Sequence, residues 1–154
     1  MAAQVISARH SIILPYRKAD ALAVIQRIES VEKIEGAAVR VTAHHEKARY
    51  GTHDVGGRFA GIPWRSRYWH ERDGDGFRGE QMHAPPLGKR ISGGFQVEAI
   101  GKHACKVSYS EEYLLPRWLV PFRPAIEGYL NWSVIKELRD LRALIAGRTA
   151  PSPR

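Results

Sequence analysis

The sequence has a single cysteine, Cys105, and no long uninterrupted hydrophobic run. One thiol cannot form an internal disulfide, which excludes a small fold held together by cystines. The apolar stretch near the N-terminus is interrupted by Arg9 and His10, which excludes an ordinary signal peptide or membrane span there. We therefore expect an intracellular, cytoplasmic protein.

Dense blocks of one charge are also missing. The chain has 24 Lys and Arg against 16 Asp and Glu, a net charge of +8, yet the basic residues are scattered singly or in pairs. A nucleic-acid surface usually concentrates them in a patch or stripe. We expect no nucleic-acid partner, and the positive charge leaves open a transient contact with an anionic membrane.

Several motifs of metal and cofactor chemistry are absent. No two histidines have the HxxxH or HxH spacing, and the adjacent pair His44 and His45 would point to opposite faces of a strand. A lone cysteine supplies no thiolate cluster. The sequence also has no phosphate-binding glycine loop and no GxSxG nucleophile elbow. We expect neither a metal nor a cofactor.

A long amphipathic helix is the strongest feature that the sequence does contain. Between Pro124 and Ala146, apolar residues recur at three- and four-residue steps: Ile126, Leu130, Val134, Leu138, Leu141 and Ile145. Pro124 suits the first helical position and Gly147 suits the end, although Gly128 interrupts the helix. At 1.5 Å per residue the helix is roughly 34 Å long. Because no other helix is long enough to cover it, its apolar face should pack on a sheet.

Alternating apolar residues predict that sheet. We expect strands at 4–14, 38–45, 50–60, 64–71, 77–82, 90–100 and 104–115. Two short helices should follow the first strand, at 18–28 and 30–34. Ile62-Pro63 and Asp73–Gly76 predict turns, and 117–123 predicts a loop.

The expected fold class is therefore α+β. Short connections make neighbouring strands antiparallel, and a curved seven-stranded sheet wrapped around the C-terminal helix would bury both apolar faces. The length of 154 residues fits one domain. We expect this domain at 1–147, followed by a disordered tail at 148–154.

This layout resembles the helix-grip fold of the START/SRPBCC superfamily, the polyketide cyclase/dehydrase-like proteins. ARHSIILP resembles the opening strand of that family, FRGEQMHAPPLGKRISGGFQV its interrupted middle strands, and VSYSEEYLLP its last strand. The resemblance covers about residues 4–146. It implies a long internal cavity that binds lipids, sterols, polyketides or other apolar molecules, and only some members are enzymes.

The strand at 64–71 allows two registers. One turns Trp64, Ser66, Tyr68 and His70 inward, and the other turns Arg65, Arg67 and Trp69 inward. We favour the first register because burying unpaired charge is costly. Glycines interrupting the strands would either leave space for a ligand or let the sheet bend.

Glu111 is the most unusual polar residue, since it shares the apolar face of its strand with Tyr109 and Tyr113. A carboxyl group there needs a partner, and such surroundings can make a general acid or base. The alternatives are a strand register shifted from the one expected here, or a structural pairing with an arginine at the rim of the site.

Three hypotheses follow. The first is a module that binds, and possibly transports, a hydrophobic small molecule such as a lipid or polyketide, lined by His10, Trp64, Tyr68, His70, Phe95, Tyr109, Glu111, Tyr129 and Trp132. The second is a cyclase or aromatase in which Tyr68, His70 and Glu111 move protons. The third is a binder of anionic surfaces that delivers lipid. The sequence leaves the ligand, the presence of catalysis and the oligomeric state open.

Overall fold

A computed structural model describes residues 4–27, 30, 40–43, 47–59, 62–82 and 89–149 of the chain. Its elements are β1 (Gln4–Leu14), α1 (Lys18–Ile25), β2 (Arg40–Ala43), β3 (Tyr50–Phe59), β4 (Ile62–Arg72), β5 (Gly76–Gln81), β6 (Lys89–Ala99), β7 (Cys105–Leu115), η1 (Arg117–Phe122) and α3 (Arg123–Thr149). The predicted α+β class, an antiparallel sheet with one long C-terminal helix, is confirmed.

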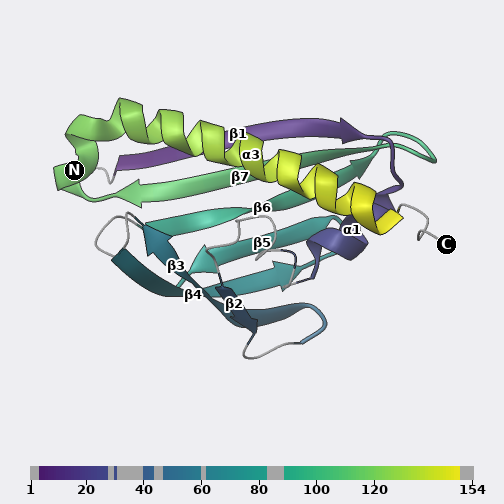
Figure 1. Cartoon of the computed structure of the whole chain (residues 1–154), viewed down its shortest axis with the longest axis horizontal. Helices are drawn as coiled ribbons and strands as arrows, with labels where there is room; N and C mark the ends of the chain where they lie inside the picture. Colours follow the sequence, from purple (N-terminus) through teal and green to yellow (C-terminus); the bar gives the residue numbers. More distant parts are fainter. Residues whose placement is uncertain are drawn as a thin grey trace.

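Strands β2 to β7 form an antiparallel meander, and β1 is added at its edge beside β7. The seven strands of the sheet lie in the order β1-β7-β6-β5-β4-β3-β2, and every pair is antiparallel. β1 pairs along its full length with β7, from Gln4 opposite Leu115 to Leu14 opposite Cys105. The N-terminal strand therefore lies beside the strand that leads into η1 and α3 (Figure 1).

The long helix α3 lies across the β1 and β7 end of the sheet (Figure 1). Five of the six apolar side chains that the helical period placed inward are buried in the core: Leu130, Val134, Leu138, Leu141 and Ile145. The sixth, Ile126, is partly buried and packs against the core. Burying a side chain of this size contributes about 1.5–3 kcal/mol. The packing of this face on β1 and β7 is therefore the main anchor of the helix.

Some predicted boundaries are wrong. The segment 117–123, expected as a loop, forms the 3₁₀ helix η1 between Pro116 and the start of α3. The turn expected at Ile62-Pro63 is instead the beginning of β4, because Ile62 pairs with Phe59 and Pro63 with Arg58. Proline is tolerated there because the first residues of a strand can lack a ladder donor.

The C-terminal boundary also differs from the prediction. Helix α3 continues two residues beyond Gly147, so the expected tail does not begin at 148. Residues 150–154 lie outside the described part of the chain, as does nearly all of the second short helix expected at 30–34.

Two glycines have contrasting surroundings. A Cβ atom on Gly76 would lie 2.0 Å from the backbone oxygen of Phe95, so only glycine permits the close approach of β5 and β6. A Cβ atom on Gly128 would meet nothing within 4 Å among the described residues.

Candidate functional site

The register of β4 selects the first of the two predicted faces. Ser66 and His70 are buried, whereas the side chains of Arg65 and Arg67 are 70% and 46% exposed. The guanidinium groups stay in solvent, as the cost of burying charge requires. Trp64 belongs to the same strand, but its side chain lies outside the described part of the chain.

One row of paired residues crosses the inner face of the sheet. It runs through Gly51 of β3, His70 of β4, Gly79 of β5, Gly93 of β6 and Glu111 of β7. The two central glycines put no side chain between the imidazole of His70 and the carboxyl group of Glu111. With strands about 4.8 Å apart, these two residues stand about 14 Å from each other along the sheet. We call this stretch the glycine floor.

At Gly79 no side chain of the described residues packs on the floor, and the close neighbour is backbone. A Cβ atom on Gly79 would meet only one heavy atom within 4 Å among the described residues, the backbone oxygen of Trp69 at 3.3 Å. The inner face at Gly79 is therefore not filled by a neighbouring side chain.

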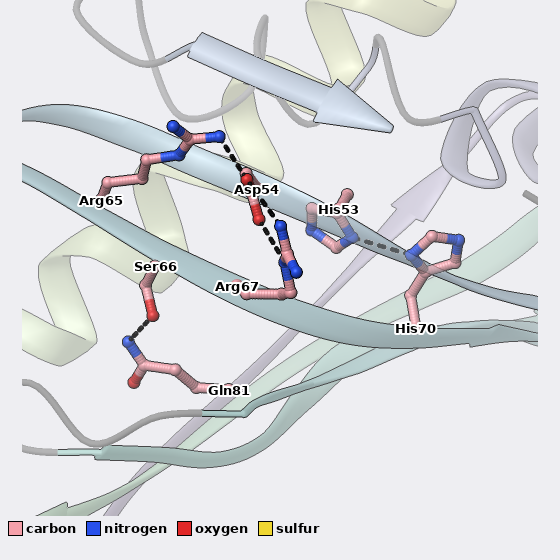
Figure 2. Close-up of polar contacts among 7 residues, drawn as sticks. All are labelled: His53, Asp54, Arg65, Ser66, Arg67, His70 and Gln81. Atoms are coloured by element: carbon pink, nitrogen blue, oxygen red, sulfur yellow. Dashed lines mark hydrogen bonds and ion pairs between the residues drawn. The ribbon is translucent and has the colours of Figure 1, made fainter. Parts of the chain in front are cut away.

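A pair of histidines stands at one end of the floor. The Nδ1 atoms of His53 and His70 lie 2.7 Å apart, and the two side chains are 4% and 0% exposed (Figure 2). One ring must donate its Nδ1–H and the other must accept at Nδ1. In the neutral pair, one Nε2 atom therefore carries a hydrogen while the other does not, so the pair holds an acid and a base together.

Aromatic rings surround this pair. Tyr68, which is half-buried, stacks on His53 with ring centroids 5.5 Å apart, and Phe77 stacks on His70 at 5.4 Å. The predicted residues Tyr68 and His70 are thus brought together. His53 is a residue that the sequence reasoning did not select.

Glu111 stands at the other end of the floor and is 3% exposed. The hydroxyl group of Tyr109 donates a hydrogen bond to its Oε1 atom. Phe95 stacks on the ring of Tyr109 with centroids 4.3 Å apart. The structure therefore gives Glu111 a tyrosine as one partner.

His10 connects the sheet to the long helix. Its Nε2–H donates to Oδ1 of Asn131 at 2.9 Å, and the amide group of Asn131 donates to the backbone oxygen of Glu127 at 2.9 Å. The register places His10 opposite Tyr109, so it adjoins the Glu111 end of the floor. Asn131 orients this imidazole, a role that the sequence alone did not indicate.

Tyr129 and Trp132 do not join the other predicted lining residues. Their side chains are 60% and 57% exposed, and their rings contact each other at 5.8 Å on the side of α3 opposite Leu130 and Val134. We expected both to line an internal site, and this is corrected. The helical period could have predicted this, because the positions that it places inward put Tyr129 and Trp132 on the outer side of the helix.

The outer face of β3 and β4 has a separate ionic cluster. Asp54 accepts from Arg65 at 2.5 Å and from Arg67 at 2.8 Å (Figure 2). Hydrogen bonding to Asp54, and then its negative charge, raise the pKa of Arg67 above the ordinary value. Asp54 follows His53 and lies on the opposite face of the strand, so this cluster holds β3 to β4 behind the histidine pair.

The described residues form no group of three or more His, Cys, Asp or Glu side chains that could hold a metal ion. No helix in the described part of the chain is long and apolar enough to cross a membrane.

Comparison with known proteins gives matches in structure only. No family model and no curated protein sequence matches the chain. The Zhui aromatase/cyclase from Streptomyces sp. R1128 matches with a TM-score of 0.82 at 10% identity, over 97% of this chain and 98% of that one. Norcoclaurine synthase from Thalictrum flavum matches with a TM-score of 0.74 at 13% identity, over 97% and 99% of the two chains.

A third solved structure, Ara h 8.0201, has a TM-score of 0.68 at 8% identity and covers 94% of this chain and 99% of that one. These likenesses extend over nearly the whole chain. At such low identity they establish a shared fold.

Proposed function

We propose that this chain, which has the helix-grip fold of the START/SRPBCC superfamily, binds a hydrophobic small molecule. The ligand would lie on the inner face of the sheet, over the glycine floor. The row that joins His70 to Glu111 through Gly79 and Gly93 carries this proposal. A sheet whose inner face served only as core would have side chains at these positions. Here the sheet itself supplies no side chain between the two polar ends.

The walls of this site suit an apolar, flat ligand. Phe77, Phe95 and Tyr109 follow one side of the floor, since they are paired two residues along their strands from Gly79, Gly93 and Glu111. Apolar contact contributes about 25 cal/mol per Å² removed from water. The imidazole and carboxyl groups at the two ends would orient the ligand.

A valine at position 79 tests this proposal. Gly79→Val would put a branched side chain on the floor and should weaken binding of an apolar fluorescent probe about tenfold. Gly101→Val is the matched control, because a Cβ atom on Gly101 meets nothing within 4 Å among the described residues. Equal probe binding by both variants and the unchanged protein would contradict a site over Gly79.

Native mass spectrometry of the purified protein addresses the ligand directly. A bound apolar molecule of defined mass should appear under native conditions and disappear after denaturing extraction. The same molecule should be depleted in the Gly79→Val protein and retained in the control.

An enzyme of the cyclase kind is a second candidate, and the two buried acid–base pairs at the ends of the floor favour it. In the neutral His53–His70 pair, the Nε2 atom that carries no hydrogen could take a proton from a substrate carbon between two carbonyl groups. The resulting enolate would attack another carbonyl carbon of the same substrate molecule, and the Tyr109–Glu111 pair could protonate the new alkoxide. Loss of water would complete an aldol closure and dehydration.

The enzyme candidate predicts a separation of binding and turnover. With synthetic poly-β-ketone thioesters as substrates, His70→Ala and Glu111→Gln should abolish cyclisation while the probe still binds. Unchanged turnover in both variants would remove these residues from catalysis. No turnover by the unchanged protein with any such substrate would leave ligand binding alone.

A further inference from the structure

A second feature lies outside the ligand site, on the surface of η1 and α3. Four aromatic side chains are more than half exposed there: Trp118 at 58%, Phe122 at 59%, Tyr129 at 60% and Trp132 at 57%. We call them the aromatic surface. Large aromatic side chains are mostly buried in folded proteins, as Phe77, Phe95 and Tyr109 are here.

These side chains come from one continuous piece of chain. Trp118 and Phe122 belong to η1, and Tyr129 and Trp132 follow within the first three turns of α3. Figure 1 shows η1 and these turns at the end of the molecule where β1 begins and β7 ends. The rings of Tyr129 and Trp132 contact each other with centroids 5.8 Å apart, and Trp118 and Phe122 are exposed on the segment that leads into α3. The aromatic surface is thus a group of exposed rings rather than a single one.

The charge of the same segment is positive. Residues 117–149 contain six basic and three acidic side chains. Two of the acids are matched within the helix, Glu127 by Arg123 at 2.7 Å and Asp140 by Lys136 at 2.7 Å, and the third, Glu137, is buried.

Three arginines of this segment remain directed to solvent. Arg117, Arg139 and Arg142 are exposed and form no ion pair with another described residue. Arg117 adjoins Trp118, and Arg139 continues the outward side of α3 that carries Trp132. Aromatic rings and unpaired guanidinium groups are therefore both exposed along this segment.

We propose that the aromatic surface docks on an anionic lipid bilayer. Tryptophan and tyrosine favour the membrane–water interface because each has an apolar ring and a polar atom. Each Lys or Arg near an anionic surface adds to the attraction. A second copy of this chain fits less well, because a symmetric contact would bring the same excess of positive charge together.

The proposal concerns binding at the surface of a bilayer, in line with the absence of a membrane-crossing helix among the described residues. It does not depend on what the inner face binds. The two can be tested separately, because Gly79→Val should leave the aromatic surface unchanged.

Sedimentation with lipid vesicles tests the proposal. The unchanged protein should pellet with vesicles of phosphatidylcholine mixed with phosphatidylserine, and not with phosphatidylcholine alone. Raising the salt concentration should weaken the binding. Replacing Trp118 and Trp132 together by alanine should lower vesicle affinity about tenfold or more. Arg139→Gln with Arg142→Gln should lower the affinity for anionic vesicles and make the remaining binding less sensitive to salt.

Tyr50→Ala is the matched control, because Tyr50 is an exposed aromatic residue on β3, far from this surface in the fold. This variant should bind vesicles like the unchanged protein. Circular dichroism should show native secondary structure for all variants, since every substituted side chain is exposed. Vesicle affinity that is absent, or that survives loss of both tryptophans, would overturn the proposal.

Two other outcomes would also overturn it. Binding to single-stranded DNA without binding to vesicles would make nucleic acid the partner. A dimer in light scattering that becomes a monomer in the double tryptophan variant, without vesicle binding, would make a second copy of the chain the occupant.

Discussion

His53 and His70 are 17 positions apart in the sequence and share one hydrogen bond in the folded chain. A proton added to either ring can be shared across the 2.7 Å contact, but a second proton would leave both Nδ1 atoms as donors facing each other. The buried pair therefore holds at most one positive charge without breaking its contact. This property would suit proton transfer at the end of the glycine floor.

Removing one histidine tests the energy of this contact. His53→Ala would leave the buried ring of His70 without its partner at Nδ1 and should lower the free energy of unfolding by about 1–3 kcal/mol. Urea unfolding followed by circular dichroism measures the change. His103→Ala, at an exposed turn, is the control and should change it by less than about 0.5 kcal/mol.

Nitrogen NMR of the unchanged protein gives an independent check. One of the two rings should show a hydrogen on Nδ1. Spectra in which both rings carry hydrogen only on Nε2 would contradict the shared bond.

Cys105 supplies a pH prediction at the same scale. Burial first, and the nearby charge of Asp20 second, raise the pKa of its thiol above 9.0. The folded state then keeps a proton that the unfolded chain releases. This contribution to stability is fully present below pH 9.0 and is lost as the pH rises above it.

The measurement compares the unchanged protein with Cys105→Ala. Between about pH 8 and about pH 10, the unchanged protein should lose more free energy of unfolding than the variant does. Other titrating groups are common to both proteins and cancel in the difference. A parallel pH dependence of the two would show that the thiol titrates alike in the folded and unfolded states.

At the scale of elements, the long helix tolerates a change that the sheet does not. Gly128→Ala removes an unfavourable glycine from α3 where a Cβ atom has open space, and should raise the free energy of unfolding by about 0.5–1 kcal/mol. Gly76→Ala should lower it, because the new Cβ would lie 2.0 Å from the backbone oxygen of Phe95.

Thermal and urea unfolding of the two variants provide the measurement. A stabilising Gly76→Ala change would contradict the close approach of β5 and β6. A destabilising Gly128→Ala change would mean that something packs against this side of α3.

At the scale of the whole molecule, strand β1 connects the N-terminal part of the chain to the C-terminal part. It pairs with β7 and lies beneath α3, so neither the sheet nor the helix is complete without it. We therefore predict that the chain unfolds as one domain. Tryptophan fluorescence and far-ultraviolet circular dichroism should give coincident urea transitions. Two separate transitions would contradict the single domain expected from the sequence.

Most of the elements could be predicted because their patterns are local. The alternation in residues 4–14 and 104–115 corresponds to β1 and β7 within a residue, and the helical period placed Leu130, Val134 and Leu138 in the core. The register of β4 also followed, since arginines on alternate positions cannot all be buried. Boundaries at Ile62 and Gly147 were wrong, because proline and glycine lower the local preference without forbidding the element.

The site was predicted only in part. Tyr68, His70, Tyr109 and Glu111 could be selected as polar or aromatic residues on inward faces. Their partners could not, because a contact between strands depends on which residues stand opposite each other.

The sequence by itself therefore determined the elements and their inward faces, because the periods of helix and strand are written along the chain. Only the tertiary structure decided that His53 meets His70, that Tyr109 binds Glu111, and that two glycines lie between these pairs. The physical reason is that pairing across five strands fixes these neighbours. The periodicity along the sequence does not predict which residues that are distant in the chain come into contact.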